Sequence, residues 1–236
     1  SRWLPVRRPD LYAGEVAQVL ARAQGIKLPK AQAVTARPTG TAVAVQESAD
    51  LATIVRLVLK YSTNLTAEVI GLTASQKRGV APGDLRSSAK AMSDWAHTTF
   101  GARDMQFVDH SGLGGASRIT ARDMVQFLVK AGYGGPLHRL MKDIAPRGAD
   151  GKVLQGAPYS IQAKTGTLNF VSSLAGYVSA ADKTPLVFAI FTGDPARRAD
   201  IARANMERPE GGKAWTRRAR WLQHQLLRRW AGLYGV

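Results

Sequence analysis

Residues 157–170 read Ala-Pro-Tyr-Ser-Ile-Gln-Ala-Lys-Thr-Gly-Thr-Leu-Asn-Phe, and two strand-like apolar runs follow them at 171–179 and 186–192. Short turns separate the runs, for example Ala-Asp-Lys-Thr-Pro at 181–185. Short connections between successive strands require an antiparallel arrangement. The stretch therefore predicts an antiparallel meander with Lys164, Thr165 and Gly166 on its first strand.

Helical patterns flank this meander in the sequence. The clearest covers 51–60, where one apolar stripe consists of Leu51, Ile54, Val55, Val58 and Leu59. Either Asp50 or Ser48 is expected to cap this helix. Other helices are expected at 10–24, 65–73, 84–100, 121–131, 136–144 and 215–233, and a strand at 41–46. This order predicts an α+β fold, an antiparallel sheet flanked by helices.

The composition sets limits on the function. A length of 236 residues, with 45% hydrophobic and 21% charged residues, suits one large globular domain. No apolar run approaches the roughly 20 residues of a membrane span, and the first residues do not resemble a signal peptide. The absence of cysteine excludes disulfides, thiol catalysis and zinc–thiolate sites. The four histidines show no metal-ligand spacing, so neither a metal nor a cofactor is expected.

The chain is strongly basic, with a net charge of +16 and an arginine concentration at 217–229. Such charge favours polyanionic partners. An anionic membrane or cell wall is one such partner, with which the protein would associate peripherally. The alternative is a solvated basic face that aids solubility. Because no common nucleic-acid-reading motif is present, no nucleic-acid partner is expected.

Two short segments carry candidate chemistry. Lys164 can attract a carboxylate or lower the pKa of a hydroxyl, Thr165 and Thr167 offer hydroxyl donors, and Gly166 leaves room for a substrate strand. The alternative for this segment is an edge strand protected by a solvated lysine.

The second segment is Ser62-Thr63-Asn64, between two expected helices. There the Ser62 hydroxyl can relay a proton, and the Asn64 amide can hold a substrate amide through its donor and its acceptor. The alternative is that Thr63 or Asn64 only caps the helix that begins at Leu65.

Together these segments resemble the D-alanyl-D-alanine carboxypeptidases of the class C low-molecular-weight penicillin-binding type. The likeness extends to Glu-Ser-Ala-Asp-Leu at 47–51, Tyr-Ser-Thr-Asn-Leu-Thr-Ala-Glu at 61–68, Asp-His-Ser-Gly-Leu at 109–113, Arg-Ile-Thr-Ala-Arg at 118–122 and Ala-Lys-Thr-Gly-Thr-Leu at 163–168. At 109–113 the family has Asp-Gly-Ser-Gly-Leu, so His110 stands at a glycine position. The resemblance covers roughly residues 10–195 in the family's order.

The resemblance implies a serine acyl-transfer enzyme, with a penicillin-binding transpeptidase-like fold, that acts on peptidoglycan peptides ending in D-Ala-D-Ala and is acylated by β-lactams. By match, Ser62 relays protons, Asn64 positions the substrate amide and Lys164 binds the terminal carboxylate. Thr165 and Thr167 assist at that carboxylate, Gly166 completes the third motif, and the Thr167 N–H forms half of the oxyanion hole. The implied location is the periplasm.

One family element has no counterpart here. The Ser-x-x-Lys nucleophile precedes Ser62 in the family, but the first 61 residues contain no such motif, and Ser87–Lys90 lies downstream in a helix expected to be structural. We therefore expect residues 1–236 to be the C-terminal portion of a single domain, with the nucleophile and the first strands supplied by the N-terminal part of the same protein. A non-catalytic module that binds peptidoglycan is the alternative.

Overall fold

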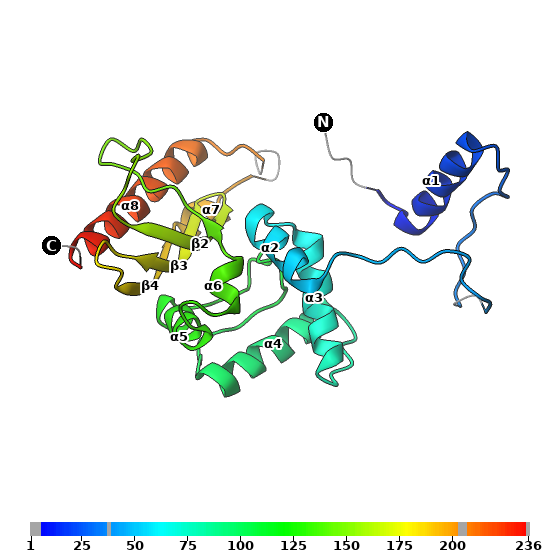
Figure 1. Cartoon of the computed structure of the whole chain (residues 1–236), viewed down its shortest axis with the longest axis horizontal. Helices are drawn as coiled ribbons and strands as arrows, with labels where there is room; N and C mark the ends of the chain where they lie inside the picture. Colours follow the sequence, from blue (N-terminus) through cyan, green and yellow to red (C-terminus); the bar gives the residue numbers. More distant parts are fainter. Residues whose placement is uncertain (1–5, 37–38, 203–206, 235–236) are drawn as a thin grey trace. The chain divides into compact units, whose positions relative to one another are not determined.

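A computed structural model of the chain describes residues 6–36, 39–202 and 207–234 (Figure 1). The residues form two compact units that divide after Ser48. No helix in the described ranges is long and apolar enough to cross a bilayer.

The first unit consists of one helix and an extended segment. After helix α1 (Pro9–Ala23), the extended segment runs back along the helix, where the Gln18 amide donates to Leu28 O at 3.2 Å. Gly14 allows this approach, since a Cβ there would lie 2.6 Å from the Ala31 side chain. No side chain of α1 is fully buried.

The second unit contains an antiparallel sheet of order β1-β2-β3-β4. Its strands are β1 (Lys142–Asp143), β2 (Ser160–Leu168), β3 (Val171–Ser179) and β4 (Pro185–Gly193). The register pairs Gly166 with Ser173 across β2 and β3. The three long strands and their antiparallel order confirm the predicted meander.

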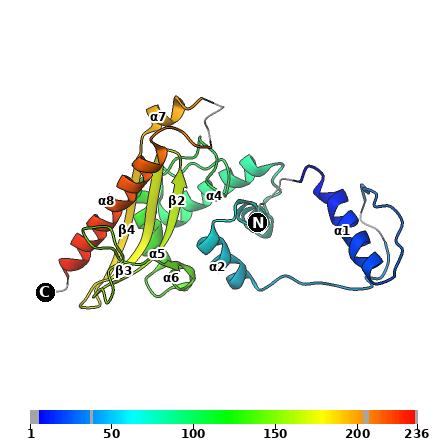
Figure 2. The same cartoon turned by 90° about the horizontal axis from the view of Figure 1, so that it is seen from above.

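Both faces of the sheet are covered by helices. On one face, Ile161, Leu174 and Val178 form a core with Leu227 of α8 (Gly212–Gly232). On the other, Ala175 and Tyr177 pack against α5 (Ala121–Ala131). Figure 2 shows α8 and α5 on opposite sides of the strands. The alternation of strand side chains between the two faces produces these two cores.

Four further helices precede or extend this core: α2 (Leu51–Tyr61), α3 (Asn64–Lys77), α4 (Leu85–Phe100) and α6 (Pro136–Leu140). The short α7 (Pro195–Ala199) follows β4. Polar caps begin several of them: Asp50 accepts from Thr53 N in α2, and Asp84 forms a capping box with Ser87 in α4. The α+β class, with helices flanking an antiparallel sheet, is thus confirmed.

Two expected elements differ from the structure. Residues 41–46 form no strand, since no described strand pairs with them, and Val43 and Val45 are exposed. The helix expected at 136–144 ends at Leu140, and Lys142–Asp143 pairs with β2 instead. The helical spacing of the sequence did not reveal that pairing with the edge of β2 would replace the last turn of this helix.

Candidate functional site

The turn between α2 and α3 holds Ser62 in an unusual backbone conformation. Ser62 has φ 56° and ψ 47°, in the left-handed region, while its N–H donates to Val58 O at 2.8 Å. A non-glycine residue in this region costs about 1 kcal/mol or more, and such residues concentrate at functional sites. The turn keeps the Ser62 side chain at the surface, where it faces β2.

Lys164 of β2 meets this serine across 102 residues of sequence. Its Nζ donates to Ser62 Oγ at 2.5 Å and also to Thr165 O. Burial, and secondarily repulsion from Lys142, lowers the pKa of the Lys164 ammonium. The structure therefore brings together the two residues that the sequence predicted to share one site.

Asn64 is the first residue of α3 and is exposed beside Ser62. Thr63 occupies the N-cap position, but its side chain makes no capping hydrogen bond. The alternative in which Thr63 or Asn64 serves only as a cap therefore lacks the hydrogen bond that would define it.

The outer edge of β2 is open beside Lys164. Strand β1 pairs only with Gln162 and Ala163, and no described strand pairs with residues 164–168 on that side. Ile144 N donates to Ile161 O, so the backbone N–H and C=O of Ile161 point toward the outer edge. Because backbone groups alternate along an antiparallel strand, the N–H groups of Thr165 and Thr167 also face this edge.

Gly166 and Thr167 are fixed by neighbours on other elements. A Cβ at Gly166 would lie 2.3 Å from Ser173 Oγ of β3, so a larger residue there would have to displace the Ser173 hydroxyl. Arg220 of α8 donates to Thr167 Oγ1 at 3.0 Å. Sequence reasoning missed Arg220, because nothing in the arginine-rich helix distinguishes it from its neighbours.

Ser87 and Lys90 of the downstream Ser-x-x-Lys match have structural contacts. Ser87 belongs to the capping box of α4, and Lys90 forms an ion pair with Asp94 at 2.7 Å, one turn along the same exposed face. These contacts agree with a structural interpretation of that match.

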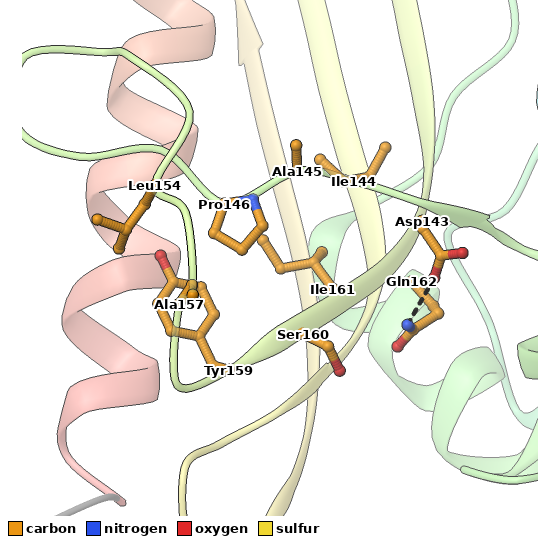
Figure 3. A pocket seen from close by; sticks show the side chains of 11 residues that line it. Asp143, Ile144, Ala145, Pro146, Leu154, Ala157, Tyr159, Ser160, Ile161 and Gln162 are labelled. Atoms are coloured by element: carbon orange, nitrogen blue, oxygen red, sulfur yellow. Dashed lines mark hydrogen bonds between the residues drawn. The ribbon is translucent and has the colours of Figure 1, made fainter.

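A cavity lies elsewhere, between the segment around Pro146 and the first half of β2 (Figure 3). It has a volume of about 440 Å³ and a mostly apolar wall that includes Ile144, Leu154 and Tyr159. Its polar side includes Asp143, which accepts from the Gln162 amide at 2.8 Å. Neither Ser62 nor Lys164 lines it, so we place the candidate site at the open edge of β2.

The described ranges contain no cluster of three or more His, Asp or Glu side chains that could hold a metal ion. The groups that the site offers are the Ser62 hydroxyl, the Lys164 ammonium, the Asn64 amide and the backbone N–H groups of β2.

Comparison with known proteins identifies relatives of this chain. The carboxypeptidase Rv3627c of Mycobacterium tuberculosis is 29% identical over 204 residues, covering 80% of this chain and 42% of that protein. The carboxypeptidase DacB of Mycolicibacterium smegmatis is 26% identical over 203 residues, covering 80% and 44%. This chain thus spans less than half the length of these two relatives.

A solved structure shares the fold: penicillin-binding protein 4 (dacB) of Haemophilus influenzae, in complex with a β-lactam. It superposes with a TM-score of 0.66 at 20% identity, covering 94% of this chain and 52% of that one. A sequence model of the D-Ala-D-Ala carboxypeptidase 3 (S13) family matches residues 1–209. The chain therefore belongs to the D-Ala-D-Ala carboxypeptidase 3 (S13) family.

Proposed function

We propose that the protein is a serine-type D-Ala-D-Ala carboxypeptidase or endopeptidase that acts on peptidoglycan stem peptides through an acyl-enzyme. The observation that carries the proposal is the Lys164–Ser62 hydrogen bond beside the open edge of β2. Family membership and the curated carboxypeptidase relatives support it.

The open edge suits a peptide substrate. An extended stem peptide adds to β2 as a further strand, and the outward N–H of Thr167 donates to the developing oxyanion. Lys164 attracts the terminal carboxylate, with Thr165 and Thr167 assisting, and Gly166 keeps this part of the strand close to β3. Asn64 holds the substrate amide from the opposite side.

The reaction proceeds in two balanced steps. A serine hydroxyl attacks the carbonyl between the two D-alanines, and its proton passes to the departing D-alanine amine, with Ser62 as relay. Water then attacks the ester carbonyl and the bond to the serine oxygen breaks; one proton of the water returns to that oxygen, and the other passes to solvent as the carboxylate forms. The pKa of Lys164, lowered by burial, favours a role for this side chain in moving protons through Ser62.

The attacking serine and its lysine are proposed to come from an N-terminal part of the same protein. Residues 1–61 hold no Ser-x-x-Lys, and Ser87 and Lys90 are engaged in the capping and the surface of α4. This chain alone is then inactive. Its substrate is in the periplasm, and β-lactams acylate the same serine, as expected from the β-lactam complex of the Haemophilus influenzae protein.

The test is covalent capture of a fluorescent penicillin by the protein that includes the preceding segment. Lys164→Gln should slow labelling by about 100-fold, because groups that transfer protons or hold the transition state contribute on this scale. Lys152→Gln is the matched control, since Lys152 is exposed and its described contacts are with Gly148 and Asp150 of its own loop. Equal labelling of the two variants would contradict the proposed role of Lys164.

The second candidate is a non-catalytic module that binds peptidoglycan. The exposed Ser62–Asn64 turn and open strand edge suit binding as well as they suit catalysis. A protein that retains soluble peptidoglycan peptides but takes up no penicillin would support this second function and exclude the first.

A further inference from the structure

The loop between α4 and α5 is folded around one carboxylate. Asp109 accepts from Gly112 N at 3.1 Å and from Gly114 N at 2.5 Å, and a two-way backbone bridge joins Gln106 and Arg118 at the base. These bonds make 109–114 a compact unit whose backbone positions are set internally.

This loop is attached to α3 by a second carboxylate. Glu68 accepts from the N–H groups of His110 and Ser111, at 3.1 and 3.0 Å. Glu68 lies about one helical turn after Asn64, so the attachment holds the beginning of α3. Hydrogen bonds to a charged acceptor are about twice as strong as neutral ones.

The His110 side chain adds a second set of contacts between this loop and helices α3 and α4. Its ring lies against Gly71 of α3 so closely that a Cβ at Gly71 would be 2.1 Å from the imidazole. Its Nε2 is 2.8 Å from Ser88 Oγ of α4, and that hydroxyl is 2.7 Å from Ser75 Oγ of α3. Ser88 and Ser75 are 0% and 5% exposed, so the ring completes a buried polar cluster between two helices.

The cluster fits a neutral imidazole. Nδ1 is buried, and no described protein group forms a hydrogen bond with it. Protonation would place an N–H without an acceptor, and a charge, in this interior. The charged groups that face the ring are Glu68 from α3 and Asp109 from the loop, while α4 presents only the Ser88 hydroxyl.

Burial and the nearby carboxylates have opposite effects on the pKa of His110, and their sum disfavours the protonated imidazole. Burial lowers the pKa of His110, and the attraction of Glu68 and Asp109 opposes this without reversing it. Because the folded pKa lies below the unfolded value of about 6.5, the unfolded loop binds the proton better. The contribution of neutral His110 to stability is therefore complete above about pH 7 and declines as the pH falls through 6.5 toward the lowered value.

We propose that His110 is a positioning residue: in its neutral form it latches the 109–114 loop to α3 and α4, and protonation opens the latch and loosens the Ser62–Asn64 turn. The latch itself is independent of the activity of the protein. Its value for positioning Ser62 and Asn64 rests on the proposed function.

The test is amide hydrogen exchange on the 236-residue chain between pH 7.5 and 5.5, corrected for intrinsic exchange rates, with the His110 imidazole titrated by NMR in the same sample. The amides of His110, Ser111 and Gly114 should lose protection as the pH falls, since protonation removes the stabilisation that the neutral imidazole gives to the loop. The midpoint pH of this loss of protection should match the midpoint of the His110 titration. The amide of Ser62 should lose protection over the same pH range. The amides of β3 should keep their protection.

Three substitutions sharpen the result. Gly71→Ala should open the loop at both pH values, because the new methyl group occupies the place of the imidazole. Gly232→Ala, also in a helix but with open space around the added carbon, is its control and should leave the loop closed. His224→Gln removes the other histidine that has a buried Nδ1 and a pKa lowered by burial, and it should retain the response of the loop.

Loop protection that is constant from pH 7.5 to 5.5, or that changes with a midpoint different from that of His110, overturns the latch. Loop opening without any change at Ser62 overturns the positioning role. Neither outcome depends on penicillin capture, so failure of the latch and failure of the proposed function are distinguishable.

Discussion

Helices α2 and α5 have the same length and similar sequence patterns, but their apolar sides differ in burial. Each has 11 residues, a polar side chain at the N-cap and an apolar stripe along one side. In α5, Leu128 is 1% exposed and packs with Ala175 and Tyr177, whose hydroxyl donates to Leu128 O at 2.7 Å. In α2 no side chain is fully buried, and Leu51 is 65% exposed.

The comparison shows that periodicity predicts a helix and its apolar side, but not the partner of that side. The strands next to α5 are within this chain. We infer that the surface that would cover α2 belongs to the proposed N-terminal part. Ser62 follows the last residue of α2, so a candidate site residue adjoins the less completely packed of these two helices.

The largest expected effect is on the core of α5. Leu128→Ala should lower the free energy of unfolding by about 2–5 kcal/mol, because it removes fully buried side-chain atoms and leaves a cavity. Leu59→Ala is the matched change in α2, where the side chain is half-buried, and should cost about 1 kcal/mol or less. Urea unfolding of both variants measures the difference, and equal losses would show that the stripe of α2 is already covered.

A smaller effect is expected when the preceding segment is present. In that longer protein the cost of Leu59→Ala should rise by about 1–2 kcal/mol, because the leucine becomes fully buried. The cost of Leu128→Ala should stay the same, since its neighbours do not change. If Leu59→Ala costs the same in both forms, the segment does not cover α2.

The smallest effect concerns the caps, where the two helices are alike. Thr120 accepts from Asp123 N at 3.1 Å, and Thr120→Ala should lower stability by about 1 kcal/mol. Asp50→Ala should also destabilise, because this carboxylate accepts from Thr53 N at 2.9 Å. Thermal unfolding of each variant measures these losses.

Only the cap of α2 should depend on pH. The backbone N–H of Thr53 is the main cause of the lowered pKa of Asp50, and the Thr53 hydroxyl adds to it. The stabilisation is therefore present above the usual Asp pKa of about 3.9 and declines as the pH falls through the lowered value. A difference between wild type and Asp50→Ala that persists unchanged at pH 2 would contradict this assignment.

Much of the fold and of the candidate site follows from local sequence. The three long strands, α2, α4 and α5 lie within a few residues of their expected bounds, because their side-chain periods and caps are local signals. The residues at 41–46 also have a strand-like pattern, but a strand forms only where another strand pairs with it. Strand β1 was not predicted from the sequence, because a strand of two residues is too short to show a periodic pattern.

The sequence by itself determined which residues offer chemistry: Ser62 and Asn64 in an interhelical turn, and Lys164, Thr165, Gly166 and Thr167 on one strand. Only the tertiary structure decided that Lys164 reaches Ser62, that Arg220 contacts Thr167 and that His110 fits against Gly71. The physical reason is range. Helix and strand patterns arise between residues a few positions apart, whereas these contacts join residues 39 to 102 positions apart (His110 − Gly71 = 39), and packing alone brings them together.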